Sequence, residues 1–191
     1  MARKDISNKL IHFTSGNSIE AFKRLNGIIK EQHIDACQRV RGGFKCVCFT
    51  EAPLASLHDG LVNANAYSRY APFGIIFDKK YIFDRGGRPV IYQTEHEFWQ
   101  LPDSLKWRHV RYEPDAIDFT WEREWRIQCE NLEISPETAG IVVPNQYWAE
   151  RIMRKYNIDE DYKIMQYSMV MDEEIAELYR EDFKWTIYRL K

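Results

Sequence analysis

This sequence of 191 residues has little net charge, few cysteines and no long apolar run. Its 27 Lys and Arg residues nearly balance its 29 Asp and Glu residues, and the formal net charge is −2. The overall charge therefore favours neither a nucleic-acid-binding protein nor a protein of anionic membrane surfaces. Apolar stretches such as 73–77 run to only about five residues, against the ~20 that a membrane-spanning helix needs. We expect no membrane association.

The four cysteines follow a charged N-terminal segment that no apolar region succeeds. This pattern lacks the features of a secretory signal, so we expect free thiols in a reducing cytoplasm. Apolar residues make up 45% of the chain and aromatic residues 14%, which predicts a globular protein with a bulky core. We expect one α+β domain over residues 1–191, with functional motifs in residues 10–127 and an aromatic-rich part over 128–191.

The pattern of apolar residues and turn residues predicts short strands that alternate with helices. A helix begins after Asn17, with Glu20 at the spacing of a capping box. The other expected helices cover 53–58, 79–85, 95–106, 145–157 and 172–182. The expected strands cover 9–14, 46–50, 73–77, 89–92, 119–127, 141–143, 162–171 and 184–190.

Residues 119–127 (FTWEREWRI) combine acids, arginines and tryptophans and are the most informative segment. If they form one strand, Glu122, Glu124 and Arg126 lie on the same face, about 7 Å apart from one to the next. Two neighbouring carboxylates on one face cost energy unless a cationic ligand, a metal or a developing positive charge uses them. The alternative is a solvent-exposed face on which Arg126 pairs with Glu124.

Two further segments carry candidate binding residues. In residues 11–15 (IHFTS), His12 and Thr14 point to the same side of a strand, next to a helix N-terminus that would favour an anion. The alternative is a hydrogen-bonded histidine of purely structural use. In residues 67–72 (YSRYAP), Tyr70 offers a stacking surface and Arg69 a guanidinium that can bind phosphate. The alternative there is a surface loop anchored by two buried tyrosines.

The cysteines do not predict a metal centre. Cys46 and Cys48 share one face of a predicted strand, and two thiolates alone do not make a zinc site. We find no nucleophile elbow, no phosphate loop and no dinucleotide fingerprint. A different metal chemistry, a magnesium-dependent nuclease, would use Asp118, Glu122 and Glu124.

The order of five short motifs resembles that of AbiGi-type abortive-infection proteins of bacteria. These motifs are residues 11–15 (IHFTS), 47–54 (VCFTEAPL), 70–75 (YAPFGI), 89–92 (PVIY) and 122–127 (EREWRI). The resemblance covers residues 10–127 and implies a role in phage defence. More distantly, the layout resembles DarT-like ADP-ribosyltransferases. That likeness implies a split, mixed β-sheet with short surrounding helices and a central cleft for NAD, which would serve as co-substrate.

The same resemblance implies roles for individual residues. His12, with Thr14 beside it, would hold a ribose hydroxyl of NAD. Tyr70 would stack near the nicotinamide and Arg69 would contact a phosphate. Glu124, or with less support Glu122, would stabilise the positive charge that develops as nicotinamide leaves.

Three functions follow as hypotheses. The first is an NAD-dependent ADP-ribosyltransferase or NAD glycohydrolase of a defence or toxin–antitoxin system, acting on an unidentified protein or nucleic-acid acceptor. It predicts that His12 and Glu124 converge on one cleft. The second is a non-catalytic binding or regulatory module, such as an antitoxin or sensor, which predicts an exposed apolar patch for a protein partner. The third is the metal-dependent nuclease.

Overall fold

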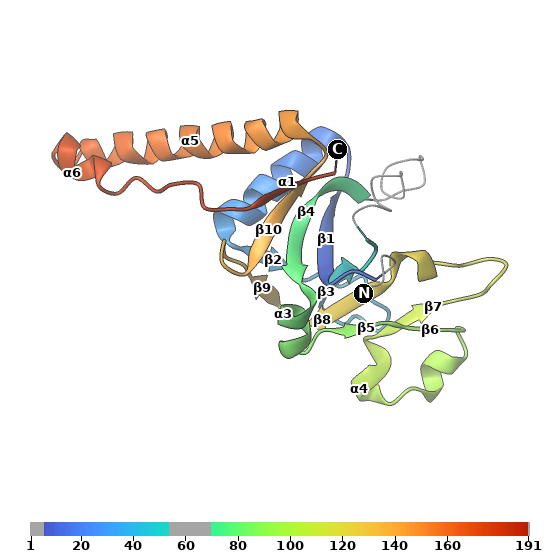
Figure 1. Ribbon diagram of the computed structural model, residues 1–191. Helices are drawn as coiled ribbons and strands as arrows, with labels where there is room; N and C mark the ends of the chain where they lie inside the picture. Colours follow the sequence, from blue (N-terminus) through green and yellow to red (C-terminus); the bar gives the residue numbers. More distant parts are fainter. Residues whose placement is uncertain (1–5, 54–69, 191) are drawn as a thin grey trace.

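A mixed seven-stranded sheet forms the centre of the molecule (Figure 1). The computed structural model describes residues 6–53 and 70–190. The strand order is β11-β10-β4-β1-β3-β8-β5, and two-stranded sheets are formed by β2 with β9 and by β6 with β7. The strands are β1 Lys9–Ser15, β2 His33–Asp35, β3 Cys46–Thr50, β4 Tyr70–Asp78, β5 Arg88–Pro89, β6 Ile91–Gln93, β7 His109–Arg111, β8 Glu124–Gln128, β9 Asn131–Glu133, β10 Ala139–Val143 and β11 Ile187–Arg189. The helices are α1 Ser18–Glu31, α3 Lys79–Asp84, α4 Asp103–Lys106, α5 Gln146–Ser168 and α6 Glu173–Glu177, with 3-10 helices η2 Glu97–Gln100 and η3 Thr120–Glu122.

The sequence predicts the start of α1 correctly. The Asn17 side chain accepts hydrogen bonds from the backbone N–H groups of Ile19 and Glu20. The Glu20 carboxylate in turn accepts a hydrogen bond from the backbone N–H of Asn17, which completes the capping box. The buried face of α1, with Leu25 and Ile29, packs toward the sheet.

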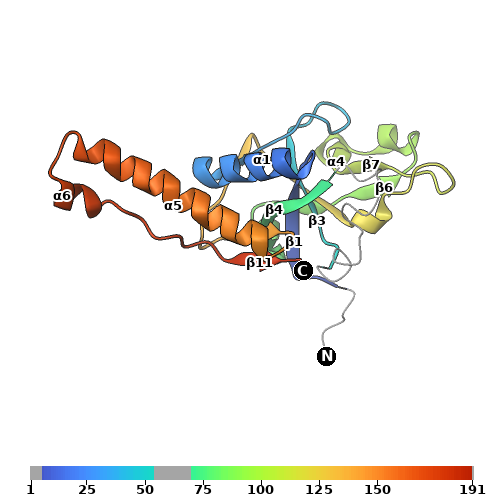
Figure 2. The same cartoon turned by 90° about the horizontal axis from the view of Figure 1, so that it is seen from above.

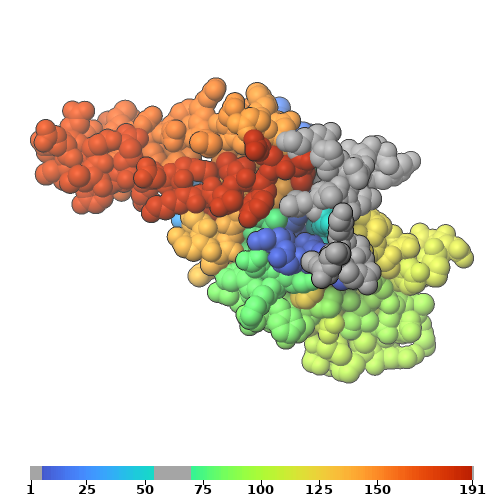
Figure 3. All heavy atoms as spheres, viewed as in Figure 1, coloured from blue at the N-terminus to red at the C-terminus, as the bar shows by residue number. Residues whose placement is uncertain are grey.

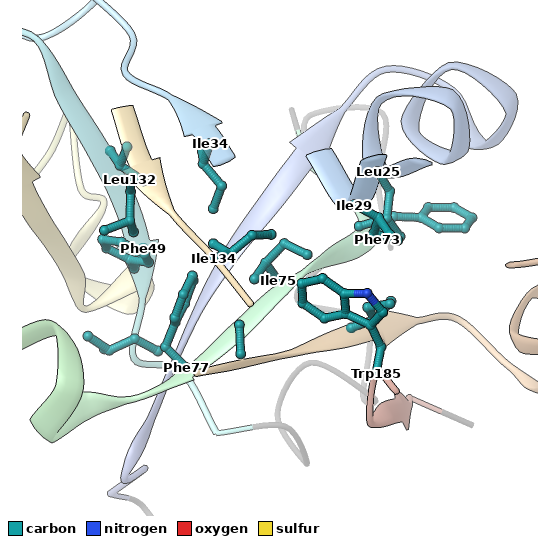
Figure 4. Packing of buried hydrophobic residues seen from close by; sticks show 14 of the residues in the cluster. Leu25, Ile29, Ile34, Phe49, Phe73, Ile75, Phe77, Leu132, Ile134 and Trp185 are labelled. Atoms are coloured by element: carbon teal, nitrogen blue, oxygen red, sulfur yellow. The ribbon is translucent and has the colours of Figure 1, made fainter. Parts of the chain in front are cut away.

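Apolar side chains fill both faces of the sheet. One face, which we call the helical face, packs against α1 and the first turns of α5 and carries the larger cluster (Figure 4). Figure 4 shows Phe73, Leu25 and Ile29 together on one side of this cluster. The second face carries a smaller cluster that includes Ile11, Phe13 and Ile76. The strands β4 and β10 are therefore apolar on both sides, as interior strands of a sheet are.

Helix α5 is longer than predicted and replaces a predicted strand. The expected strand over 162–171 is wrong, because α5 continues to Ser168. Tyr162, Met165 and Met169 recur at spacings of three and four residues, which is the period of a helix and not of a strand. In two views α5 runs past the edge of the sheet, with α6 at its far end (Figures 1 and 2). We call residues 156–182 the arm and the rest of the described chain the body.

Four other expectations are corrected by the structure. The expected helix 95–106 is split into η2 and α4, because Pro102 disfavours a helical conformation at Leu101, which is extended. Strand β4 begins at Tyr70, three residues before the predicted start. The expected strand 89–92 is divided between β5 and β6, which belong to different sheets. The surrounding helices are not all short, since α5 has 23 residues.

The predicted helix 53–58 falls almost entirely outside the described residues. No helix in the described ranges 6–53 and 70–190 is both long and apolar enough to cross a bilayer.

Candidate functional site

The sheet places His12 and Glu124 on opposite faces. Ile11 pairs with Thr50, and Thr50 pairs with Glu124, so these three residues form a row across β1, β3 and β8. Directly paired residues in antiparallel strands point to the same side, and their chain neighbours point to the other. His12 therefore shares the helical face with Phe49, its edge-on ring neighbour at 6.3 Å. The expected convergence of His12 and Glu124 on one cleft is not found.

His12 and Thr14 lie on the same side of β1, as predicted, but both bind the protein itself. Nδ1 of the partly buried His12 lies 2.9 Å from the carbonyl oxygen of Cys48. Burial lowers the pKa of His12 below its usual value. The buried hydroxyl of Thr14 donates to the carbonyl oxygen of Phe73 at 3.0 Å. These contacts agree with the alternative interpretation of this strand, in which His12 is hydrogen-bonded within the protein and has a structural role only.

Glu124 and Arg126 form a buried ion pair on the second face. Nε of Arg126 lies 2.7 Å from Oε1 of Glu124, and a second guanidinium nitrogen lies 3.2 Å from Oε2. The Glu124 side chain is only 13% exposed and that of Arg126 10%. The alternative interpretation therefore named the right partner for Glu124, but the pair is largely buried and not solvent-exposed. Burial alone would lower the pKa of Arg126, but the adjacent carboxylate of Glu124 outweighs it and raises that pKa.

The guanidinium of Arg126 also connects the sheet to residues 107–109. Its Nη1 donates to the carbonyl oxygens of Trp107 and His109, at 2.9 and 3.0 Å. The five donors of an arginine suit such a node, because they can bind a carboxylate and carbonyl groups together. The Glu124–Arg126 pair therefore fastens residues 107–109 over this part of the second face.

Two more titratable side chains adjoin the pair. The hydroxyl of Tyr92 accepts a hydrogen bond from the backbone N–H of Glu124 at 3.1 Å and donates to the carbonyl oxygen of Phe119 at 3.2 Å. Burial raises the pKa of Tyr92 to about 12. Burial, followed by the charge of Glu124, also raises the pKa of the Cys48 thiol. Both groups stay neutral near pH 7, so Glu124 and Arg126 carry the charge here.

Glu122 does not belong to the same strand face as Glu124. It ends η3, and Arg123 then adopts the left-handed conformation with φ 46° before β8 begins. The expected continuous strand over 119–127 is therefore wrong in its first half. The backbone carbonyl of Glu122 accepts a hydrogen bond from the Thr50 hydroxyl at 2.5 Å, which anchors this turn to β3. A left-handed non-glycine residue is not visible in a pattern of charge and hydrophobicity.

Tyr70 is the first residue of β4 and pairs with Ser15 of β1. Its ring packs against the apolar cluster of the second face, the face that also carries Glu124. Arg69, the predicted phosphate contact, lies outside the described residues. Of the predicted NAD-binding residues, the structure thus places Tyr70 and Glu124 on one face and His12 and Thr14 on the other.

The acids proposed for a nuclease do not form a metal-binding group. Asp118 accepts hydrogen bonds from the backbone N–H and the hydroxyl of Thr120, at 2.8 and 2.6 Å. Across residues 6–53 and 70–190, no three His, Cys, Asp or Glu side chains are arranged to hold a metal ion. Two surface hollows of the described chain, one beside Phe44 and Cys129 and the other beside His33 and Arg85, include none of the predicted site residues.

Glu51 is a contact residue to which the sequence analysis gave no role. Its carboxylate accepts a hydrogen bond from the indole N–H of Trp125 at 2.7 Å and pairs with Lys79 at 2.7 Å. Trp125 and Lys79 are remote from Glu51 in the sequence, so the sequence alone does not predict these contacts. The one signal at Glu51 is its place in the motif 47–54. Glu51 thus joins β3, β8 and the start of α3.

The arm presents an apolar stripe that the body does not cover. Ile158, Tyr162, Met165 and Met169 are each about half exposed or more, and they recur at spacings of four, three and four residues. We call these four residues the arm seam. The period of 3.6 residues per turn places the seam opposite Ile164 and Tyr167. Ile164 is buried, and the ring of Tyr167 lies 5.4 Å from that of Tyr179.

The arm is also acidic. Residues 156–182 contain nine acidic and two basic side chains, a formal net charge of −7, which leaves +5 for the remainder of a chain whose total is −2. The space-filling view shows the arm as a protrusion from the body (Figure 3). An apolar helical stripe within acidic surroundings is suited to a basic amphipathic partner.

Searches against family models, curated proteins and solved structures find no match to this chain.

Proposed function

We propose that this protein is a non-catalytic binding module whose arm docks a basic amphipathic helix of a partner protein. The observation that carries the proposal is the arm seam, a row of apolar side chains at helical spacing on a projecting helix. Aligned apolar residues at these spacings are what one helix presents to another. The acidic side chains around the seam favour lysine and arginine on the flanks of the partner helix.

The contacts inside the body agree with this function. The polar groups from which a catalytic role was expected are engaged within the protein: Glu124 with Arg126, Thr14 with Phe73, and His12 with Cys48. The seam has no such internal use. If the resemblance to AbiGi-type proteins extends to biology, the partner is another component of a phage-defence system and this chain is its antitoxin or sensor.

A pair of designed peptides tests the docking. Both are amphipathic helices of about 20 residues with leucine at the a and d positions, one flanked by lysines and the other by glutamates. We expect the basic peptide to bind the full-length protein and the acidic peptide not to bind, in a fluorescence-anisotropy titration. Ile158→Glu, on the seam, should weaken binding of the basic peptide at least about tenfold.

The body supplies a matched control. Ile19 is an exposed isoleucine on α1, 62% exposed against 55% for Ile158. Ile19→Glu should therefore bind the basic peptide as the wild type does. Equal binding of the two peptides, or equal affinities for the Ile19→Glu and Ile158→Glu proteins, would show that the seam is not a specific docking site.

The second candidate function is NAD-dependent ADP-ribosylation or NAD hydrolysis. It is supported only by the common face of Tyr70 and Glu124, which lie on β4 and β8 with β1 and β3 between them. In that role Glu124 exchanges Arg126 for a ribose hydroxyl and stabilises the positive charge that develops as nicotinamide leaves. The acceptor is an unidentified protein or nucleic acid, and the fold is then a divergent relative of the ADP-ribosyltransferase sheet.

Nicotinamide release from NAD tests this second function. The purified protein is assayed alone and with DNA, RNA or cell lysate, and Glu124→Gln is compared with Glu122→Gln. This second function predicts release by the wild type and by Glu122→Gln, and none by Glu124→Gln, at temperatures where all three are folded. No release in any mixture, together with no change of Tm on addition of NAD, refutes the NAD-dependent activity.

A further inference from the structure

Two cysteines face each other across a short antiparallel bridge at the start of β3. Cys37 precedes the loop 38–45, and Cys46 follows it as the first residue of β3. The N–H of Cys37 donates to the carbonyl oxygen of Cys46 at 3.0 Å, and the N–H of Cys46 donates to that of Cys37 at 3.2 Å. Both thiols are free in this structure.

This pairing brings the two Cα atoms within the range of a disulfide. Residues that exchange both backbone hydrogen bonds have Cα atoms about 5.5 Å apart and side chains on the same side of the ladder. Disulfides join cysteines whose Cα atoms are about 4.4–6.8 Å apart. The Cβ atoms of such a pair are about 5.5 Å apart, against about 3.5–4.5 Å in a disulfide, so joining Cys37 to Cys46 also requires the two backbones to approach by about 1 Å.

The other two cysteines are less well placed to react with Cys37. Cys48 shares the strand face of Cys46 but lies two residues farther along β3, about 7 Å away, and Cys37 is paired with Cys46. Cys129 packs against the core of the helical face, with Sγ 3.9 Å from the carbonyl oxygen of Ile127. Cys46 is buried in a different cluster, with Val40 and Trp107. The geometry thus selects one partner among three.

The two thiols differ in access. Cys37 is exposed, and its sulfur accepts a hydrogen bond from the backbone N–H of Arg39 at 3.4 Å. Cys46 is buried, and burial raises the pKa of its thiol to about 11. A diffusing oxidant therefore meets Cys37 first, and Cys46 is positioned to react afterwards.

We propose that Cys37 and Cys46 form a reversible disulfide when the protein meets a hydroperoxide. The Cys37 thiolate attacks the O–O bond of hydrogen peroxide and, with one proton, yields a sulfenic acid and one water. The Cys46 sulfur then displaces the hydroxyl group, its proton leaves with that group as a second water, and the S–S bond forms. The two thiols lose two electrons and the peroxide gains them.

The bond would close the neck of the loop 38–45. This loop packs Val40 against Trp107 and places the Arg41 guanidinium 4.0 Å from the centre of the Phe98 ring. Trp107 belongs to the segment that the Glu124–Arg126 pair also holds. Oxidation therefore stiffens the attachment of residues 88–111 to the sheet.

Peptide mapping of the full-length protein without reduction tests the proposal. After hydrogen peroxide treatment we expect a peptide that links Cys37 to Cys46, two remaining free thiols, and reversal by dithiothreitol. The Tm should rise by a few degrees on oxidation, because the bridge restricts the unfolded chain. Cys37→Ser, at an exposed position, should abolish both the linked peptide and the rise.

Cys129→Ser and Cys48→Ser serve as matched controls and should retain the link. A link from Cys37 to Cys48 or Cys129, a link between two molecules, or conversion of Cys37 to a sulfinic acid with Cys46 still free would each overturn the proposal. The linked peptide is measured in the wild-type protein, so the result does not depend on the folding of any variant.

Discussion

The body and the arm use the same kinds of residue in opposite ways. In the body, charged and polar groups turn inward: Arg126 binds one carboxylate and two backbone carbonyls, and Thr14 donates to a neighbouring strand. In the arm, apolar residues turn outward: Met169 and Leu178 are 73% and 83% exposed. Buried polar groups need partners and exposed apolar groups gain from being covered, so Arg126 and Thr14 are satisfied within the chain, whereas Met169 and Leu178 are left uncovered.

This contrast points to the arm as the functional part of the protein, because its apolar surface is exposed. A side chain that already makes its hydrogen bonds within the fold must break them to act on a ligand. The exposed arm seam breaks nothing when a partner covers it. The charge follows the same division, with −7 on the arm and +5 on the remainder of the chain.

The strongest test of the contrast compares an ion pair of the body with one of the arm. Glu124→Leu leaves the buried Arg126 guanidinium without its carboxylate and should lower the free energy of unfolding by about 3–5 kcal/mol. Asp159→Leu removes the exposed pair between Asp159 of the arm and Lys155 just before the arm, where both side chains are about half exposed, and should cost only about 0.5 kcal/mol. Urea unfolding measures both. Similar losses of free energy of unfolding for the two variants would mean that the Glu124–Arg126 pair stabilises the fold no more than the exposed pair of Asp159.

A second test compares two isoleucines six residues apart on α5. Ile152 is 1% exposed at the root of the helix and Ile158 is 55% exposed on the seam. Ile152→Ala should lower the free energy of unfolding by about 2–5 kcal/mol, because it leaves a cavity in the core. Ile158→Ala should change it by less than about 0.5 kcal/mol. A large loss for Ile158→Ala would show that the seam stabilises the fold of this chain.

The smallest expected effect is the change of stability with pH that His12 causes. Burial holds the pKa of His12 below the ~6.5 of the unfolded chain. Below about pH 6.5, His12 is therefore protonated in the unfolded chain while it is still neutral in the folded chain. The His12 contribution to stability is therefore complete above that pH and is lost as the pH falls, by at most ~1.4 kcal/mol per pH unit.

Urea midpoints at about pH 7.5 and about pH 5.5 measure this loss, and His12→Gln should show a smaller decline than the wild type. The exposed His96 provides the matched variant, His96→Gln, which should keep the wild-type decline. An unchanged decline in His12→Gln would show that other groups cause the acid sensitivity.

Local signals in the sequence predicted much of the body. The capping box located the start of α1, and unbroken apolar runs located β3 and the centre of β4, because these features depend on neighbouring residues. The candidate site was predicted less well. The pairing of Glu124 with Arg126 followed from their spacing of two residues, but their burial depends on Trp107 and His109, which only the fold brings over them.

The sequence by itself determined the α+β character of the chain, most of its buried strands and the concentration of acid and apolar residues in 156–182. Only the tertiary structure decided that His12 and Glu124 lie on opposite faces, because one left-handed residue and the register of three strands set the direction of each side chain. It also decided that the arm seam stays exposed. Period and composition specify that a helix has an apolar stripe, but whether anything covers that stripe depends on where the rest of the chain folds.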